Sequence, residues 1–556
     1  MNFWQRRTGA SVLMLLVVVS MLLAGCDTGS SGTGSKYGGS VTIVPAPNGV
    51  FTRNFNPFLA NSSRTGTQGM IYETLLMFNR MNGNSQPWLA SSYSVAKDAT
   101  SITFHLRQGV KWTDGQPFTS DDVVYTLKLM QKYPALDGNS LWSTIQSVSN
   151  PDASTVTVAF KQPAVTMLWY LGGQTYIVPE HIWKNISDPS TDANPNPVGT
   201  GPFALKSFDP QLYVLGKNAH YWQPGKPYVD ELRYPAYNSN TSADLLLSQG
   251  QVDWTGLYTP NINKTFVQLD PTHNHYWFPP SDVVMLYLNT AKAPFNQLAV
   301  RQALSAAIDR QKISQVAENN YDPVASPTGL VLPADQKYLN AAYANSTFSV
   351  DAAKATSLLE KAGYKKGANG MFVGQDGKPL AFKINVVAGW TDWLTASQIM
   401  ASDFKAIGID ATVNVATFND YISALAQGDF DTAISWTSPG PTPYFLYNSM
   451  LNSTNTAAIG QKATSNWERW NDKATDTLLN QYVSSTDEAT QQQALAGLQK
   501  IMVEQLPSIP LMYGPTWYEY NTSHFVGWPD QSNPYASPAP YNAPDAELVA
   551  LTIHQP

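Results

Sequence analysis

Residues 102–127 read ITFHLRQGVKWTDGQPFTSDDVVYTL and form the most regular pattern in the chain. Apolar and polar residues alternate from Ser101 to Leu106, which is typical of a half-buried strand. Asp114-Gly115 then marks a tight turn. Thr119 precedes two acidic residues, a capping pattern that predicts a helix ending near Lys132. The stretch therefore predicts a strand and a helix joined by tight turns.

Strands and helices alternate along much of the remaining chain. A helix is expected at 69–78 and a longer one at 298–316. The charged residues of the longer helix are interpreted as a surface charge pattern or a contact between domains; they are Arg301, Asp309 and Arg310. Further strands are expected at 381–387 and 409–415, with helices between and after them. This alternation indicates α/β domains.

Composition excludes several classes of protein. The chain has 556 residues, 43% of them hydrophobic, which predicts two or three domains with substantial cores. Its single cysteine, Cys26, leaves no internal disulfide. A net charge of -7 gives no reason to expect nucleic acid or an anionic lipid surface as partner. Aromatic residues make up 12% of the chain, which suits stacking against uncharged ligands as well as core packing.

The N-terminal residues have the parts of an export signal. Two arginines precede an apolar run at 12–23, which is too short for a comfortable membrane span. Leu-Leu-Ala-Gly-Cys at 22–26 is similar to a bacterial lipobox, which implies a signal peptide at 1–25 and a lipid on the thiol of Cys26. An ordinary signal peptide and an uncleaved anchor stay open as alternatives. In each case the rest of the chain lies outside the cytoplasm, and 26–37 contains the cysteine and a flexible linker.

The stretch SWTSPGPTPYFLY at 435–447 is the first candidate for ligand contact. It follows a short apolar strand at 430–434, and α/β sheets place binding groups in loops at strand ends. The stretch offers flat aromatic faces and hydroxyl groups, carried by Trp436, Tyr444, Tyr447, Thr437 and Ser438. The alternative is that these aromatic side chains pack under a Pro-rich loop.

Five stretches together resemble landmarks of the extracytoplasmic solute-binding proteins that serve oligopeptide and dipeptide ABC importers. They are 102–127, Pro-Val-Gly-Thr-Gly-Pro-Phe at 197–203, and 294–313, 351–364 and 506–513, in the family's order. The resemblance implies an α/β, two-lobed periplasmic-binding-protein-like fold with an extra inserted subdomain and a two-segment hinge. Such lobes close around a ligand.

The resemblance also implies a domain division. Lobe I combines 38–60, 197–279 and 516–556, and 61–196 is the inserted subdomain. Lobe II is 280–515, so the chain crosses between lobes twice. These two crossings are expected to act as the hinge.

The candidate loop departs from the peptide binders of this family. Their loop resembles Trp-x-x-Asp, where the Asp holds the peptide amino group, but here Pro439 stands three residues after Trp436. A buried ammonium needs a paired carboxylate. The resemblance therefore leaves two ligand classes open, namely oligopeptides and β-linked oligosaccharides such as cello-oligosaccharides.

Residues outside the loop complete the expected site. Trp390 and Trp393 are expected to stack on sugar rings, or Asp392 between them supplies a replacement carboxylate. Core packing is the alternative for this group. Phe55 and Asn56 are expected to reach the cleft from lobe I.

No catalytic or metal-binding residue is predicted. His273 and His275 lack a convincing third ligand, and the chain has no nucleophile elbow or phosphate loop. An exported hydrolase stays the alternative of another class, because paired carboxylates need no local motif. The sequence predicts a monomeric, cofactor-free binding protein that contacts the membrane through its lipid, binds no nucleic acid, and delivers a small solute to an ABC permease complex.

Overall fold

A computed structural model describes residues 35–59, 64–332 and 334–556. Within these ranges, three sheets contain four or more strands each. The seven-stranded sheet has the order β12 (Asn274–Tyr276), β20 (Glu519–Asn521), β11 (Trp254–Thr255), β1 (Ser40–Val44), β10 (Glu231–Pro235), β9 (Leu212–Lys217) and β8 (Phe203–Asp209). The five-stranded sheet has the order β17 (Asp410–Ala416), β16 (Ala381–Val387), β18 (Thr432–Ser435), β13 (Pro280–Leu288) and β19 (Ser508–Pro515). The four-stranded sheet has the order β4 (Ala90–Val95), β5 (Ser101–Leu106), β7 (Thr155–Phe160) and β6 (Ile145–Asp152). Two further pairs are β2 (Leu76–Phe78) with β3 (Ser85–Pro87), and β14 (Lys365–Lys366) with β15 (Phe372–Val373).

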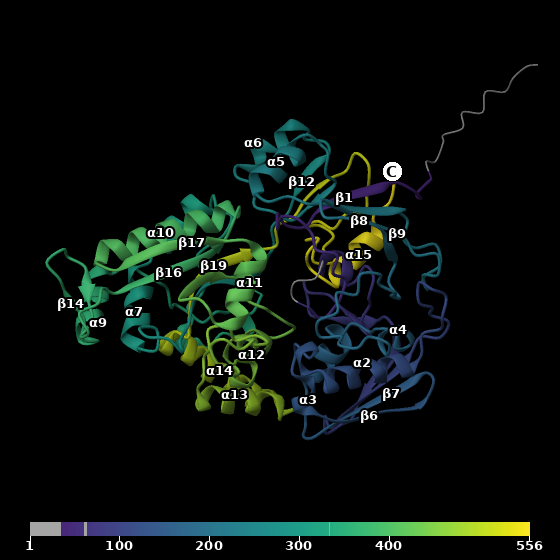
Figure 1. The fold of residues 1–556 in the computed structure, drawn as a ribbon, viewed down its shortest axis with the longest axis horizontal. Helices are drawn as coiled ribbons and strands as arrows, with labels where there is room; N and C mark the ends of the chain where they lie inside the picture. The colour runs from purple at the N-terminus through teal and green to yellow at the C-terminus, as the bar shows by residue number, and fades with distance from the viewer. Residues whose placement is uncertain (1–34, 60–63, 333) are drawn as a thin grey trace, which may run out of the picture. The chain divides into compact units, whose positions relative to one another are not determined.

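Helices pack against these sheets and against one another. The longer ones are α2 (Ser120–Lys132), α5 (Asn240–Ser248), α7 (Leu298–Ala307), α9 (Ala352–Lys361), α10 (Thr391–Ile407), α11 (Phe418–Gln427), α12 (Pro443–Leu451), α13 (Lys473–Val483), α14 (Glu488–Gln505) and α15 (Asp545–Thr552). The short ones are α1 (Arg64–Thr67), α3 (Leu141–Thr144), α4 (Glu180–Trp183), α6 (Ile262–Thr265) and α8 (Arg310–Lys312). In the green part of Figure 1, α10 lies along β16 and β17.

The strand and helix predicted within 102–127 are confirmed as β5 and α2. Along β5 the apolar side chains of Ile102, Phe104 and Leu106 are buried. Thr119 caps α2: its hydroxyl accepts from the N–H of Asp121 at 3.3 Å. The carboxylate of Asp122 in turn accepts from the N–H of Thr119 at 3.0 Å. Local sequence signals and tertiary burial agree in this unit.

The helix predicted at 69–78 is absent, and that prediction is wrong. The carbonyl of Met70 accepts from the N–H of Phe203 (3.0 Å), and that of Ile71 accepts from Gly201 (2.9 Å). Gly199 and Gly201 permit this approach, because a Cβ at either position would overlap the backbone at 70–71. Hydrogen bonds to a distant segment therefore replace those of a local helix.

The helix predicted at 298–316 is interrupted, so that prediction is also wrong. Ile308 is extended after α7, and the carboxylate of Asp309 caps α8 by accepting from the N–H of Lys312 (3.0 Å). Arg310 donates to the carbonyl of Pro510 (2.7 Å), and Arg301 donates to the carbonyl of Gln505 (2.7 Å). Both arginines are buried. They bond to β19 and to the end of α14, and do not form a surface charge pattern.

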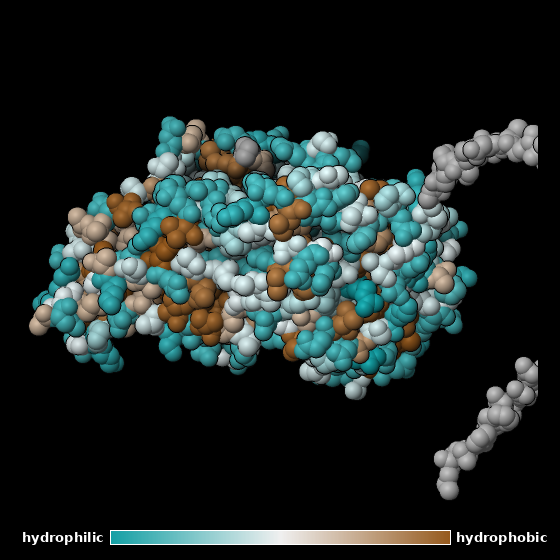
Figure 2. All heavy atoms as spheres, turned by 90° about the horizontal axis from the view of Figure 1, so that it is seen from above, coloured by the Kyte–Doolittle hydropathy of each residue, from teal (hydrophilic) through white to brown (hydrophobic). Residues whose placement is uncertain are grey.

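The face shown in Figure 2 is mostly hydrophilic, with hydrophobic side chains in separate small patches. Within the described ranges, no helix is both long enough and apolar enough to cross a membrane. The predicted signal peptide at 1–25 and the lipidation site Cys26 lie outside the described residues, as does the linker up to residue 34.

Candidate functional site

The loop after β18 begins at one edge of the five-stranded sheet. Strands β16, β17 and β18 run parallel, so the residues that follow each of them meet at this edge. Two hydrogen bonds to β13 hold the start of the loop. The hydroxyl of Tyr287 donates to the carbonyl of Trp436 (2.7 Å), and the N–H of Val283 donates to the hydroxyl of Thr437 (3.1 Å).

Four aromatic side chains from three connections form a cluster at this edge, which we call the aromatic cluster. They are Trp390, Trp393, Phe418 and Trp436. The Trp436 ring centre lies 6.1 Å from that of Trp390 and 6.0 Å from that of Trp393, and the Phe418 ring is parallel to it at 6.4 Å. Trp393 is buried, whereas the other three rings are partly exposed. The structure thus brings together the three tryptophans that the sequence singled out.

Phe418 was not among the predicted site residues. It directly follows Thr417, the residue that caps α11 after β17. The same strand-end rule that selects Trp436 after β18 selects Phe418 after β17. The predicted strand at 409–415 therefore carried a usable signal for this residue.

Tyr444 and Tyr447 lie on α12 and are buried. The Tyr444 ring stacks on Tyr482 at 4.7 Å, and its hydroxyl donates to the side-chain oxygen of Asn448 (3.1 Å). The Tyr447 hydroxyl donates to the carbonyl of Thr328 (2.8 Å). In this arrangement both tyrosines pack the helix against its neighbours. Of the loop's predicted hydroxyl groups, that of Thr437 is buried, whereas Ser438 is exposed.

Phe55 and Asn56 are fully buried. Phe55 packs edge-on against Phe208 and Tyr213, with ring centres 6.0 and 5.9 Å away. The Asn56 amide donates to the carbonyls of Pro189 (3.0 Å) and Asp192 (2.8 Å). These contacts hold the loop at 188–194 in place, so the structure uses both residues for packing.

Asp392 is buried at the first turn of α10, between Trp390 and Trp393 in sequence. Burial raises the pKa of its carboxyl to about 6, because removal from water disfavours the charged form. Asn240, at the start of α5, donates to this carboxylate at 3.2 Å. The N–H of Asn240 also donates to the carbonyl of Gly389 (3.1 Å). The turn that carries Trp390 and Asp392 is therefore bonded to the helix that follows β10.

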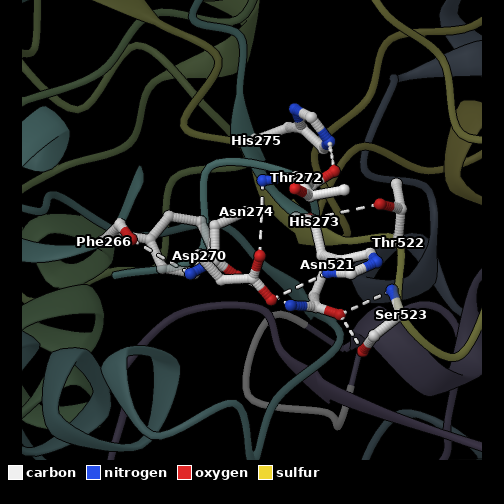
Figure 3. A network of polar contacts seen from close by, with 9 residues as sticks. All are labelled: Phe266, Asp270, Thr272, His273, Asn274, His275, Asn521, Thr522 and Ser523. Atoms are coloured by element: carbon white, nitrogen blue, oxygen red, sulfur yellow. Dashed lines mark hydrogen bonds and ion pairs between the residues drawn. The ribbon is translucent and has the colours of Figure 1, made fainter. Parts of the chain in front are cut away.

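The two histidines considered for a metal lie in the polar network of Figure 3, and each has a protein partner. His273 contacts the carboxylate of Asp270 (2.8 Å), and His275 contacts the carbonyl of Thr272 (3.2 Å). Nearby, the Asn521 amide donates to the oxygen of Asn274 at 2.7 Å, joining β20 to β12. In the described ranges, no group of three His, Cys, Asp or Glu side chains is placed to hold a metal ion.

Comparison with known proteins gives one family and one fold. The family described as bacterial extracellular solute-binding proteins, family 5 middle, matches residues 84–458. The chain is 24% identical over 544 residues to the oligopeptide-binding protein OppA of Bacillus subtilis, covering 92% of this chain and 95% of OppA. It is 27% identical over 377 residues to the nickel-binding periplasmic protein of Escherichia coli, covering 64% of this chain and 68% of that protein.

A solved structure of the same kind extends the match to the whole fold. It is the mannohexaose-bound periplasmic oligopeptide-binding protein of an ABC transporter from Thermotoga maritima. Its TM-score is 0.86 at 27% identity, covering 93% of this chain and 98% of that chain. The two-lobed α/β fold expected from the sequence is thereby confirmed. The chain belongs to the bacterial extracellular solute-binding proteins of family 5.

Proposed function

We propose that the protein captures an oligomeric solute between its two lobes and delivers it to the permease of an ABC importer. Family membership supports this role, and the sheets support the predicted division of the chain. Every strand of the seven-stranded sheet falls within 38–60, 197–279 or 516–556, and every strand of the five-stranded sheet falls within 280–515. Two chain crossings between these sheets are the arrangement that hinge closure requires.

The observation that supports the proposal most directly is the aromatic cluster at the sheet edge. Partly exposed aromatic rings suit sugar rings, which stack on aromatic side chains through their C–H surfaces. The indole N–H groups of Trp390 and of the adjacent Trp467 have no partner among the described residues. Because buried donors are almost always hydrogen-bonded, solute oxygens are natural acceptors for them. We therefore propose a β-linked oligosaccharide as the solute class, with the sugar rings stacked on Trp436 and Trp390 and with the buried Trp393 packed behind these two rings.

An oligopeptide is the second candidate, supported by a specific observation. Pro439 removes the expected carboxylate, but Asp392 places another one beside the same tryptophans. The OppA relative is named for oligopeptide binding. In that case Asp392 would hold the amino group of the peptide.

The remaining site residues take supporting roles in the proposal. Ser438 is exposed on the loop and offers its hydroxyl to the solute, and Thr437 fixes the loop to β13. Tyr444 and Tyr447 position α12, whereas Phe55 and Asn56 shape the loop at 188–194. We propose further that the protein works as a monomer held near the permease by a lipid on Cys26.

A binding screen with one substitution tests the proposal. Cellobiose to cellopentaose and di- to pentapeptides are compared by thermal shift, since a bound solute stabilises the folded state. Trp436→Ala should weaken binding of the best oligosaccharide by about 30-fold, or ~2 kcal/mol, because it removes a central aromatic contact. Trp142→Ala, a half-buried tryptophan of the inserted subdomain, is the matched control and should leave affinity unchanged.

The outcomes separate the alternatives. Peptide binding that Asp392→Ala abolishes and Trp436→Ala spares would move the assignment to the second candidate. Release of shorter sugars or peptides at catalytic rates would contradict the transport role and favour the exported hydrolase.

A further inference from the structure

Four carboxyl groups lie close enough to influence one another near the start of α10, and none has a basic partner among the described residues. They are Asp244, Glu318, Asp322 and Asp392. Glu318, Asp322 and Asp392 are at most 4% exposed, and Asp244 is partly buried. Among the ion pairs of the described residues, none involves any of these four.

Hydrogen bonds link the elements that carry these groups. On α5, Asn240 bonds to Asp392, and Asp244 lies one turn further along the same helix face. Asp244 accepts from the hydroxyl of Thr259 at 2.7 Å. The neighbouring Tyr258 hydroxyl contacts the amide of Asn319, the residue after Glu318. The elements that carry the four carboxyl groups, namely α5, the start of α10 and the turn at 318–322, are therefore neighbours in the fold.

Glu318 is the member that most directly indicates a missing partner. Its side chain is fully buried, and neither carboxylate oxygen has a hydrogen-bond partner among the described residues. A buried carboxylate without a counter-charge or hydrogen bonds costs several kcal/mol. Native proteins rarely leave such a group unpaired, so a proton, a water or a ligand group is expected there.

The electrostatics of the group point the same way. Burial, followed by the charges of Asp392 and Asp322, raises the pKa of Glu318 well above its ordinary value. Burial and the charge of Asp392 raise the pKa of Asp244 to about 7. The carboxyl groups thus destabilise one another when ionised. A positive charge among them would remove that cost.

We propose that the transported solute carries a positively charged amino group, which sits among Asp244, Glu318, Asp322 and Asp392. This inference rests on the proposed function, because it names a chemical feature of the same solute. Two sources share this chemistry: an oligosaccharide built of amino sugars, and a peptide with a free amino group. The rings of the aromatic cluster suit either one, since a cation is also attracted to aromatic faces.

Three β-1,4-linked tetramers that differ at one position of each ring test the charge directly. Cellotetraose carries a hydroxyl, the glucosamine tetramer an ammonium, and the N-acetylglucosamine tetramer a neutral amide. Tetraalanine and N-acetyl-tetraalanine form the peptide arm. We expect one of the two compound series, sugars or peptides, to bind better. Within that series, calorimetry should show that the compound with the free amine binds about 30-fold more tightly than the neutral compounds, the size expected for a buried charge pair. When the titration is repeated in buffers of different ionisation enthalpy, the measured heat should reveal proton release on binding of the amine and none on binding of the neutral compounds.

Conservative variants assign the effect to these carboxyl groups. Glu318→Gln and Asp392→Asn should each reduce the affinity for the amine by about 30-fold and leave the neutral tetramers unaffected. Glu360→Gln, an exposed glutamate on α9, is the matched control and should change neither. Equal affinity for charged and neutral probes would overturn the inference and leave the proposed function standing. Absence of binding by every probe would count against both.

Discussion

Two buried glutamates, Glu73 and Glu547, face each other near the C-terminal helix and share a set of donors. The indole N–H of Trp222 donates to Glu73 (2.9 Å), and that of Trp88 donates to Glu547 (3.1 Å). The Tyr221 hydroxyl lies within 3.2 Å of Glu73 and 3.4 Å of Glu547. Burial raises the pKa of Glu73 from 4.5 to about 7. Burial and the charge of Glu73 raise the pKa of Glu547 well above its ordinary value.

This pair predicts that the protein is more stable at mildly acidic pH. A carboxyl whose pKa is raised in the folded state binds its proton more tightly there than in the unfolded chain. The free energy of unfolding should therefore fall as pH rises from about 4.5 through 7, by on the order of 2 kcal/mol for this pair. Urea unfolding followed by tryptophan fluorescence at pH 5, 6, 7 and 8 measures the slope.

Two variants isolate the contribution of the pair. Glu73→Gln should flatten the slope, since one of the two titrating groups is gone. A residual slope is expected from other buried carboxyl groups, such as Glu468 and Glu519, whose pKa values burial raises to about 8. Glu360→Gln, which removes an exposed carboxyl, should keep the full slope. An unchanged slope in Glu73→Gln would show that the pair does not titrate as described.

Among the connections between elements, the turn at Gly389 couples the aromatic cluster to α5. Gly389 has a φ of 83°, and a Cβ there would overlap the carbonyl oxygen of Asn238. That neighbour is backbone, so no side-chain rotation relieves the overlap. Gly389→Ala should therefore push the turn away from α5, displace Trp390 and weaken solute binding by about tenfold, or ~1.4 kcal/mol. Calorimetry with the best solute of the screen measures the change.

A second glycine controls for the cost of the backbone conformation. Gly377 has a φ of 75°, and a Cβ there meets nothing within 4 Å. Gly377→Ala pays the same left-handed strain of about 1 kcal/mol without the overlap. It should lower stability slightly and leave affinity unchanged. If both variants bind equally well, the turn at Gly389 has no part in binding.

Elements were predictable from sequence where local signals and burial agree. The alternation of β5 and the cap of α2 by Thr119 are visible in the chain itself. The failures at 69–78 and at Ile308 have a common physical cause, because the partners that decide them lie far along the chain. The N–H of Gly201 donates to the carbonyl of Ile71, and the guanidinium of Arg310 donates to the carbonyl of Pro510. No local period encodes such contacts.

The candidate site was predictable in part for the same reason. Strand ends are visible in the sequence, so Trp436 and Trp390 could be placed at one sheet edge. The sequence predicts a loop at Tyr444 and Tyr447, whereas in the structure Pro443 starts α12 and both side chains are buried. The sequence places Asp392 next to two tryptophans, whereas no local pattern relates Glu318 to them. The proximity of Glu318 to Asp392 depends on the fold of α5 and of the turn at 318–322.

For the molecule as a whole, the proposal requires the two sheet regions to hold a solute between them. The chain crosses between the sheets from β12 to β13 and from β19 to β20. Beside these crossings, the N–H of Ile262 donates to the hydroxyl of Tyr321 (3.0 Å), and Asn319 contacts Tyr258. A solute charge near Glu318 would lie close to both contacts. Binding and closure would then depend on the same few side chains.

The proposed lipid on Cys26 predicts where the whole protein resides. A serine at position 26 has no thiol to accept a lipid, and each buried lipid CH₂ contributes about 0.8 kcal/mol to membrane binding. Cys26→Ser should therefore move the protein from the membrane fraction to the soluble one, as measured by fractionation. Its affinity for solute should not change, because residue 26 precedes the domains that bind. Thr28→Ser, which keeps the cysteine, should stay with the membrane. A Cys26→Ser protein that remained on the membrane would mean that the apolar run at 12–23 anchors the chain, and the tether would then be peptide instead of lipid.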